Sequence, residues 1–244
     1  MSSTSDSTSE HFDALAADYA RLRASDDPIT ERVVELGRLR GARVLDVGCG
    51  PGTVVRRLAE QFGADAIGVD RSEKMIEAAR ADGGEFHVGA AEALPFADAA
   101  FDAVVMRMVV HHLDRSCAFA EIRRVLRPGG RLVITTSNPE TVDKFWLVEY
   151  FPSFAAIDRA RFPSAATLER ELRDAGFGNV EVGPFTFRRS FSRAEALAKL
   201  RGRAYSTFAL MDADEYDAGV AAAEARLPDR IDYDVRLLNI VATR

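Results

Sequence analysis

The feature that most limits how this chain can fold is a set of three glycines at alternate positions. Gly48, Gly50 and Gly52 follow directly on the apolar run Arg43–Val47. A short apolar run is typical of a buried strand, and glycines let a turn bring its backbone close to a ligand. The pattern therefore predicts a strand that ends in a ligand-binding turn. Asp46 adds a carboxylate beside this turn, which a phosphate-binding loop would disfavour.

Short apolar runs alternate with helical patterns through the first 137 residues. The expected strands are 43–47, 64–70, 85–89, 101–108 and 131–137, and the expected intervening helices are 54–62, 72–81 and the region around 117–126. This alternation predicts a parallel sheet with helices on both faces. Right-handed crossovers then make the sheet doubly wound.

The pattern changes after residue 138. Residues 139–165 are aromatic and helical in pattern, 176–187 predict a sixth strand, 188–230 are mostly helical and charged, and 232–243 predict a last strand. Because an insertion separates the last two strands, we expect an antiparallel pair at one edge of the sheet. The predicted fold class is α/β: a doubly wound, mostly parallel seven-stranded sheet with an antiparallel last strand and a helical cap.

Composition narrows the class of protein. The chain has 244 residues, 47% of them hydrophobic, and a formal net charge of −6, which argues against a dedicated nucleic-acid binder. Two cysteines cannot form a disulfide framework, which indicates a reducing compartment, so we expect a cytoplasmic protein. The polar first ten residues do not resemble a signal peptide and predict a disordered tail, and no apolar run is long enough to span a membrane.

The glycine turn departs from the common phosphate-binding motifs. A dinucleotide fingerprint would place the third glycine one residue later, and Pro51 intervenes; a Walker loop would need Gly-Lys-Ser/Thr. Asp46 suits a cationic ligand, and Asp70, which ends the second predicted strand, can accept hydrogen bonds from a ribose diol. A ribose, an adenine-sized ring and a cationic amino-acid tail together describe S-adenosylmethionine.

With these residues in place, the sequence resembles the class I S-adenosylmethionine-dependent methyltransferases. It is similar to the branch that contains ubiquinone and menaquinone biosynthesis enzymes and many small-molecule methyltransferases. The matching motifs occur in the family's order and are VLDVGCGPGT, IGVD, EALPFADAAFDAVV, HHL and LRPGGRL. The stretch HFDALAADYARLR also resembles the family's entry helix, in which a tyrosine and an arginine face the cofactor, here Tyr19 and Arg23.

The resemblance implies a cofactor site for S-adenosylmethionine, with S-adenosylhomocysteine as product. The expected residues are Tyr19, Arg23, Asp46, Gly48, Cys49, Gly50, Pro51, Gly52, Asp70, Arg71, Met75, Ala91, Glu92, Arg107 and Met108. One departure concerns adenine: Ala90 stands where the family often has an acid that binds the adenine amino group. Recognition is then left to Ala91 and Glu92, through backbone or side chain.

The resemblance also implies a division of the chain. We expect a tail (1–10), a cofactor-binding core with an entry helix (11–138), a lid (139–165), a return to the sheet (166–187), a helical cap insertion (188–230) and the last strand (231–244). In this fold the lid lies above the cofactor's methyl group. Its aromatic residues Trp146, Tyr150 and Phe151 are candidates for the acceptor pocket, although such a stretch is more often core.

The expected reaction is an in-line methyl transfer to a small molecule, in which the protein positions and desolvates the acceptor. A hydroxyl acceptor would need a base, and His111 and His112, after the fourth predicted strand, are candidates. Their more ordinary interpretation is the start of a helix. Adjacent histidines without a carboxylate cluster do not predict a metal site, so no metal is expected.

Alternatives remain open at this point. The basic stretch 188–203 could serve an RNA or protein methyltransferase, although a solvated helix face paired with the acidic stretch 212–229 is the simpler interpretation. A non-catalytic S-adenosylmethionine-binding regulator and an NAD-linked oxidoreductase are further alternatives. VVMRM stands where DNA-adenine enzymes carry an Asn/Asp-Pro-Pro-aromatic motif, which disfavours that chemistry. We expect a monomer or homodimer.

Overall fold

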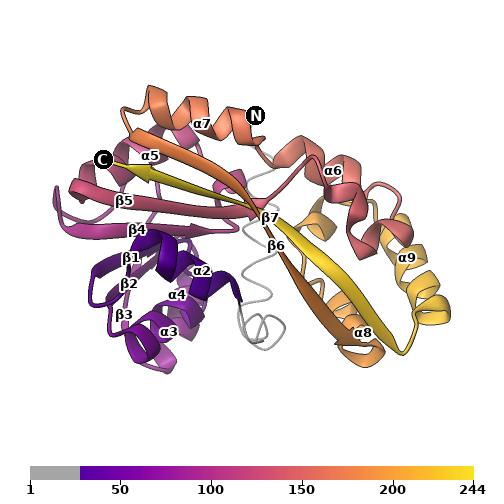
Figure 1. The fold of residues 1–244 in the computed structure, drawn as a ribbon. Helices are drawn as coiled ribbons and strands as arrows, with labels where there is room; N and C mark the ends of the chain where they lie inside the picture. The colour runs from indigo at the N-terminus through magenta and orange to yellow at the C-terminus, as the bar shows by residue number, and fades with distance from the viewer. Residues whose placement is uncertain (1–27) are drawn as a thin grey trace.

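The computed structural model describes residues 28–244, and its centre is a seven-stranded sheet (Figure 1). The strand order is β3-β2-β1-β4-β5-β7-β6. The strands are β1 (Arg43–Val47), β2 (Asp65–Asp70), β3 (Glu85–Val88), β4 (Phe101–Arg107), β5 (Leu126–Ser137), β6 (Gly178–Ser192) and β7 (Arg230–Thr243). The first five are parallel to one another, and β7 runs antiparallel to both of its neighbours. The predicted fold class is therefore confirmed.

Helices cover both faces of the sheet. They are α2 (Pro28–Gly37), α3 (Thr53–Phe62), α4 (Glu73–Ala81), α5 (Arg115–Val125), α6 (Phe154–Arg161), α7 (Ala165–Asp174), α8 (Arg193–Arg201) and α9 (Ala213–Arg226). One face packs under α2, α3 and α4, where Val33 and Leu58 meet Val44 and Val105. The other face packs under α5 and α7. Apolar residues at helical spacing supply each contact, so burial of one stripe per helix holds the layers together.

Strands β6 and β7 extend beyond the rest of the sheet. β5 pairs with β7 only over residues 237–243, whereas β6 pairs with β7 from Arg230 to Thr243. Residues 186–192 and 230–236 therefore form a two-stranded ribbon that projects past Ser137, the carboxyl end of β5 (Figure 1). We call this segment the ribbon.

The ribbon corrects two predicted boundaries. The cap insertion begins after Ser192 rather than at residue 188, and β7 begins at Arg230, so the insertion spans 193–229. The physical reason is that alternation of more and less exposed residues continues through β6 as far as Phe191, which is buried. A period of two is a strand pattern, and it persists although the residues there are strongly basic.

A separate hydrophobic core fills the cap, which comprises α6, α8, α9 and three short 3-10 turns: η2 (Val142–Lys144), η3 (Trp146–Glu149) and η4 (Ser206–Leu210). Its buried members are Leu147, Tyr150, Phe151, Phe154, Phe191, Ala196, Leu200, Phe208, Tyr216, Ala223, Leu227, Ile231 and Tyr233. Phe191, Ile231 and Tyr233 come from the ribbon, so the ribbon joins the cap to the sheet. The cap thus stands beyond the carboxyl ends of the parallel strands.

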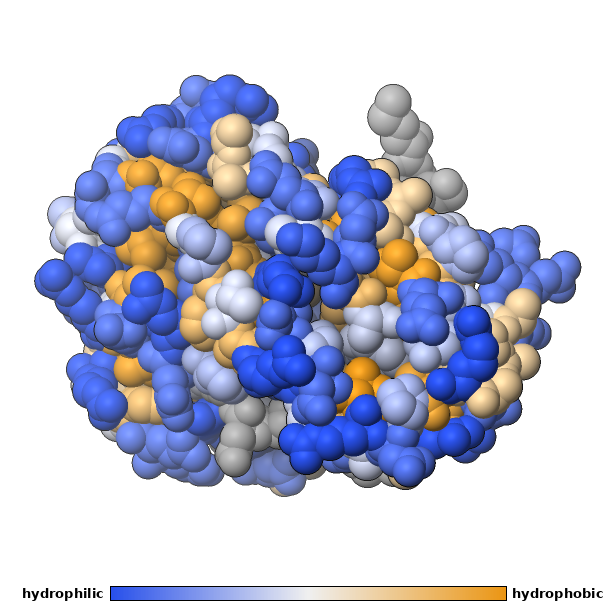
Figure 2. Space-filling view, turned by 45° about the vertical axis from the view of Figure 1, so that its right-hand side comes forward, coloured by the Kyte–Doolittle hydropathy of each residue, from blue (hydrophilic) through white to orange (hydrophobic). Residues whose placement is uncertain are grey.

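Further observations concern the hydropathy of the surface, the length of the helices and the metal-ligating side chains. On the face drawn in Figure 2, hydrophilic residues cover most of the surface and hydrophobic residues form smaller patches. Within residues 28–244 no helix is both long enough and apolar enough to cross a membrane. The same residues contain no group of three or more histidine, cysteine or acidic side chains placed to hold a metal ion.

Phe151→Ala tests whether the cap core depends on this ring. Phe151 has no exposed surface, and its ring centroid lies 5.0 Å from that of Phe208. We expect the free energy of unfolding to fall by about 3–5 kcal/mol, as for other buried Phe→Ala changes. Trp146 is the only tryptophan of the chain and lies against this core, so its fluorescence during denaturant unfolding reports on the cap. Val88→Ala, at an exposed position, is the control; equal losses for the two variants would contradict the assignment.

Candidate functional site

The three glycines of the turn after β1 have different neighbours. All are left-handed, with φ of 73° at Gly48, 52° at Gly50 and 76° at Gly52. A Cβ on Gly48 would lie 2.5 Å from Val109 Cγ2, and one on Gly52 would lie 2.4 Å from Phe86 Cζ. A Cβ on Gly50 would meet open space among the described residues, of which Met75 Sδ is the nearest at 4.0 Å. Gly48 and Gly52 are therefore required for packing, and Gly50 leaves room for a ligand.

The N–H groups of the turn are already used within the protein. Those of Gly48 and Cys49 donate to Val69 O at 2.8 and 3.1 Å, and that of Gly52 donates to Cys49 O at 3.1 Å. Gly50 N donates to Asp70 Oδ2 at 2.9 Å, and Pro51 has no N–H. A phosphate-binding loop points such groups at its ligand. Residues 48–52 therefore cannot act as a phosphate cradle, which explains why an aspartate is tolerated beside them.

Asp70, at the end of β2, fastens the turn to the next helix. Its Oδ2 accepts from Gly50 N, and its Oδ1 accepts from Ser72 N at 3.0 Å, just before α4. Burial raises the pKa of Asp70, while these two hydrogen bonds and the charge of Arg71 oppose the rise. Each carboxylate oxygen can accept a second hydrogen bond, so the group can still bind a diol. Sequence reasoning predicted the ligand contact but not this structural role.

Asp46 is buried in β1, two residues before the turn. Its residue is only 2% exposed, and its Oδ1 has no hydrogen-bond partner among the described residues. Burial foremost, and also the charge of Asp70, raise the pKa of Asp46 to about 7, whereas Arg107 opposes the rise. A buried carboxylate without a full set of partners is costly. A cationic ligand or an N–H donor at this place would relieve that cost.

Arg107 ends β4, near enough to Asp46 to lower its pKa, and Met108 follows the strand. Arg107 donates to Thr30 Oγ1 of α2 at 3.3 Å, so it also ties the helix to the carboxyl edge. Met108 has φ of 56°, which is uncommon for a residue other than glycine, and its N–H donates to Thr135 O at 2.8 Å. Strained backbone of this kind is often found at functional sites.

Cys49 belongs to the turn and Met75 to α4, and both side chains are buried. Burial foremost, with the charges of Asp46 and Asp70, raises the pKa of Cys49, so the residue is a neutral thiol. Its place in the turn agrees with a small packing residue rather than a redox group. Met75 is 3% exposed and brings its sulfur closest to the space left by Gly50.

The segment after β3 holds Ala91 and Glu92. Ala91 is buried in the core under α5, and Glu92 Oε1 accepts from Asp114 N at 2.9 Å. Asp114 is the N-cap of α5, so the Glu92 side chain joins this segment to that helix. The bond to Asp114 fixes the Glu92 side chain, so of the two routes that the sequence left open for adenine recognition we favour the backbone.

His111 and His112 belong to a 3-10 turn, η1 (Val110–His112), just after β4. The ring centroid of His111 lies 3.9 Å from that of His112 and 4.0 Å from that of Phe162. Phe162 follows α6, so the contact joins the carboxyl edge of the sheet to the cap. No pattern in the sequence indicated Phe162, because the contact joins segments that are far apart along the chain.

The predicted acceptor-pocket residues belong mostly to the cap core. Phe151 is completely buried and presents no surface to a ligand, so its assignment to the pocket is corrected to a packing role. Tyr150 is also buried, with Arg226 Cζ 5.3 Å from its ring centroid. Trp146 is half-buried, and its buried Nε1 has no hydrogen-bond partner among residues 28–244. Tyr19 and Arg23 lie outside the described residues, and Arg71 is exposed beside Asp70.

Within the basic stretch 188–203, two arginines form ion pairs with acids. Arg201 contacts Glu224 at 2.6 Å, and Arg188 contacts Asp234 at 3.2 Å. Arg193 donates to the backbone carbonyl of Glu224, and Arg203 lies over the ring of Tyr216 at 3.8 Å from its centroid. These contacts engage the stretch within the protein, which supports a structural, solvated face.

The site thus defines a class of protein. A doubly wound sheet whose first strand ends in a glycine turn without available N–H groups, next to one buried and one partly buried acid, is suited to a nucleoside with a cationic tail. The residues present fit S-adenosylmethionine: Asp46 Oδ1 has no partner within residues 28–244, Asp70 retains acceptor capacity and Gly50 leaves space.

Comparisons with known proteins name the family. Residues 45–134 match the model of a methyltransferase domain. The chain is 33% identical over 201 residues to an O-methyltransferase of Penicillium expansum, covering 72% of this chain and 71% of that protein. It is also 33% identical over 202 residues to a malonyl-[acyl-carrier protein] O-methyltransferase of Methylococcus capsulatus, covering 77% and 72%. The chain belongs to the class I S-adenosylmethionine-dependent methyltransferases.

Solved structures share the fold. A structure from Anabaena variabilis, described as a methyltransferase of an antibiotic biosynthesis pathway, matches with a TM-score of 0.77 at 24% identity, covering 91% of this chain and 99% of that chain. At this identity the likeness shows the fold alone. The same fold with a TM-score of 0.59 occurs in a protein described as the [4+2]-cyclase SpnF, so the fold does not by itself fix the reaction. The enzyme class, the cofactor and the small-molecule branch predicted from the sequence are confirmed through the relatives.

Gly50→Val tests whether the turn leaves room for the cofactor. The added side chain fills the open space at Gly50, so we expect loss of S-adenosylhomocysteine binding with the fold retained. Isothermal titration calorimetry measures the binding, and circular dichroism checks the fold. Gly63→Val is a matched control, because Gly63 also has positive φ (65°) with nothing within 4 Å of its Cβ position, but it caps α3 away from the turn. Cofactor binding at wild-type affinity in folded Gly50→Val would refute this role.

Asp46 predicts a pH dependence of cofactor binding. Because its pKa is raised to about 7 from 3.8, the free protein keeps a proton that the unfolded chain has lost. The free energy of unfolding therefore falls as pH rises from about 4 to about 7. A cation favours the ionised form, so the affinity for S-adenosylmethionine should increase between about pH 6 and about pH 8.

Calorimetric titration across this range measures the effect. Asp46→Asn should flatten the profile, and Asp65→Asn, exposed at the opposite end of β2, should leave it unchanged. A profile that is equally steep in Asp46→Asn would assign the titration to another group.

Proposed function

We propose that this enzyme transfers the methyl group of S-adenosylmethionine to an oxygen atom of a small molecule held between the carboxyl ends of β4 and β5 and the cap. The observation that carries the proposal is the position of the cap on the ribbon. In open α/β sheets ligands bind outside the carboxyl ends of the strands. The ribbon extends past that edge, and the cap core is built on its outer half.

The residues of the turn would hold the cofactor. Asp70 would accept hydrogen bonds from the ribose hydroxyls while it keeps Gly50 in place. Asp46 would balance the positive charge of the amino-acid tail, and the backbone of Ala91 and Glu92 would lie beside the adenine. When bound, the cofactor supplies a methyl group already activated on a sulfonium. The remaining task of the protein is to position the acceptor and exclude water.

The cap would exclude water from the acceptor. Residues 139–165 leave the carboxyl end of β5 and enter the cap core through Leu147 and Phe154. Phe162 then returns to the edge of the sheet, where it contacts His111. A lid anchored by a packed core can keep the region between these contacts dry, and loss of charge on sulfur during transfer favours a dry site.

A hydroxyl acceptor needs to lose a proton, and His111 or His112 would accept it, whereas a carboxyl acceptor is already ionised at neutral pH. Both histidines follow β4 directly and lie at the junction of the sheet and the cap. The two relatives described above are named O-methyltransferases, and so are two more from Aspergillus species that are 32% and 33% identical. Together these observations favour a hydroxyl or carboxyl acceptor. The basic residues of 188–203 make contacts within the protein, which weakens the case for an RNA acceptor.

The test is a search for the acceptor with labelled cofactor. Purified enzyme is incubated with S-adenosylmethionine carrying a deuterated methyl group and with libraries of phenols, aliphatic alcohols and carboxylic acids. We expect mass spectrometry to detect a methyl ether or ester. For a hydroxyl acceptor, His111→Gln or His112→Gln should lower the rate, and the loss should become smaller as rising pH ionises the acceptor without a base. Labelled tRNA or protein instead of a small molecule, or transfer to nitrogen or carbon, would overturn the proposal.

A further inference from the structure

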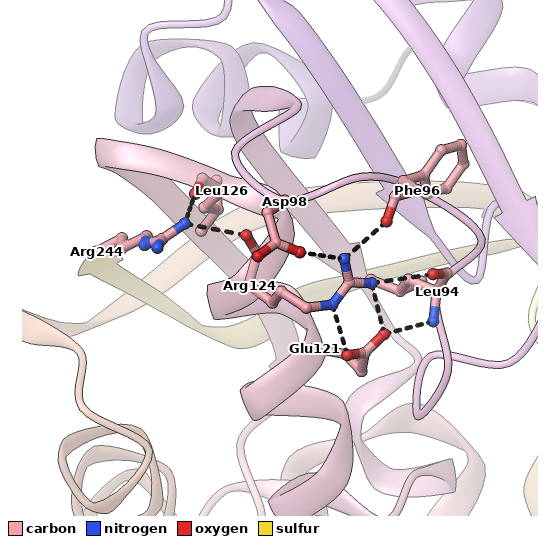
Figure 3. Close-up of polar contacts among 7 residues, drawn as sticks. All are labelled: Leu94, Phe96, Asp98, Glu121, Arg124, Leu126 and Arg244. Carbon is pink, nitrogen blue, oxygen red and sulfur yellow. Dashed lines mark hydrogen bonds and ion pairs between the residues drawn. The ribbon is translucent and has the colours of Figure 1, made fainter.

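The segment between β3 and β4 has no helix or strand, and one arginine determines much of its conformation. Figure 3 shows Arg124 of α5 surrounded by Leu94, Phe96, Asp98 and Glu121. Its Nη1 donates to Phe96 O at 2.7 Å and to Asp98 Oδ1 at 2.8 Å. Its Nη2 donates to Leu94 O at 3.1 Å and to Glu121 Oε2 at 2.8 Å, and its Nε donates to Glu121 Oε1 at 2.8 Å.

These contacts use all five N–H donors of the guanidinium. Arginine carries five donors in a rigid plane, and lysine can offer only three from a single atom. Glu121 in turn accepts from Leu94 N at 2.8 Å, so the arginine and the glutamate hold both the N–H and the C=O of Leu94. The segment is therefore fixed by a side-chain pair from α5 in place of a sheet or helix ladder.

The same segment is tied at further points. Gly89 N donates to Asp70 O at 2.9 Å, next to the cofactor turn. Ala99 N donates to Arg124 O at 3.0 Å, and the carbonyl of Arg124 also accepts from Arg244 at 2.9 Å. Arg244 extends this contact to Leu126 O, so the end of β7 supports the end of α5 (Figure 3). The hydrogen bond with Arg124 lowers the pKa of Glu121, which keeps the pair charged at neutral pH.

We infer that the Glu121–Arg124 pair positions the backbone of residues 90–93 to recognise the adenine base of the cofactor. This inference rests on the proposed placement of adenine beside Ala91 and Glu92. Ala91 and Leu94 are 6% and 5% exposed in the same core, so a shift at Leu94 is passed to Ala91 three residues away. Arg124 touches no ligand in this arrangement and is a positioning residue.

Arg124→Lys tests the inference, because it keeps the charge and loses the planar set of donors. The probes are S-adenosylhomocysteine and S-inosylhomocysteine, which differ at the base where an amino group is replaced by an oxygen. Calorimetry gives the ratio of their affinities. We expect Arg124→Lys to lower this ratio about three- to tenfold, the effect of losing one well-placed hydrogen bond. Hydrogen exchange at the Leu94 amide should become faster in the same variant.

Two controls separate positioning from general loss of stability. Arg173→Lys changes an exposed pair with Glu169 on α7, also at 2.8 Å, and should leave the ratio unchanged. Asp70→Ala should weaken both probes alike. If Arg124→Lys does not fold, Glu121→Gln keeps an oxygen for the Leu94 N–H and should lower the ratio in the same direction.

The outcomes distinguish this inference from the proposed function. An Arg124→Lys enzyme that binds S-adenosylhomocysteine with the wild-type ratio overturns the positioning role and leaves methyl transfer untouched. A wild-type ratio near one overturns the placement of adenine and the positioning role with it. Failure of the wild-type protein to transfer a methyl group, with the ratio still lowered in Arg124→Lys, would overturn only the proposed function.

Discussion

The carboxyl edge of the sheet depends on the hydrogen bonds that join the turn after β1 to the end of β2. Two N–H groups of the turn reach the carbonyl of Val69, and a third reaches the carboxylate of Asp70. These bonds require left-handed backbone at Gly48 and Gly50, which only glycine adopts without cost. Because its N–H groups bond within the protein, the turn has a fixed shape and offers none of these groups to a phosphate. The ligand is then recognised by side-chain carboxylates and by shape.

The internal use of these N–H groups explains why acidic side chains are found at the site. Asp46 is buried and Asp70 partly buried, and desolvation raises the pKa of each. Two neighbouring acids in such a place are unfavourable because of desolvation and mutual repulsion, and the free protein offsets only part of this cost. At Asp70 the hydrogen bonds from Ser72 N and Gly50 N do so. Arg107 offsets part of the cost at Asp46. The site is therefore electrostatically prepared for a positive ligand, which is the property that distinguishes a sulfonium cofactor from a dinucleotide.

The sequence was sufficient for the sheet, the turn and the cofactor, because each leaves a local signal. Period-two and period-3.6 patterns place the strands and helices, and the spacing of Gly48, Gly50, Gly52 and Asp70 places the site. The boundary of the cap was wrong because Arg188 and Arg189 have the charge of a helix surface but the alternation of a strand. Phe151 was misassigned because an aromatic residue in a connecting segment looks the same whether it lines a pocket or fills a core. In the sequence, the only trace of the five Arg124 contacts is the three-residue spacing between Glu121 and Arg124. Such a spacing is common on any helix.

These errors share a physical cause and point to how the enzyme is built. Contacts such as His111 with Phe162, or Arg124 with Leu94, join segments that are far apart in sequence, and their geometry exists only when the sheet is formed. The parallel sheet fixes the cofactor edge, whereas the ribbon sets how far the cap stands from it. The sheet and the cap therefore rest on different cores, one under α5 and one among α6, α8 and α9. With the acceptor placed beside the cap, as proposed, substitutions in the cap core would change the acceptor without disturbing the turn after β1, a division that suits a family with one cofactor and many acceptors.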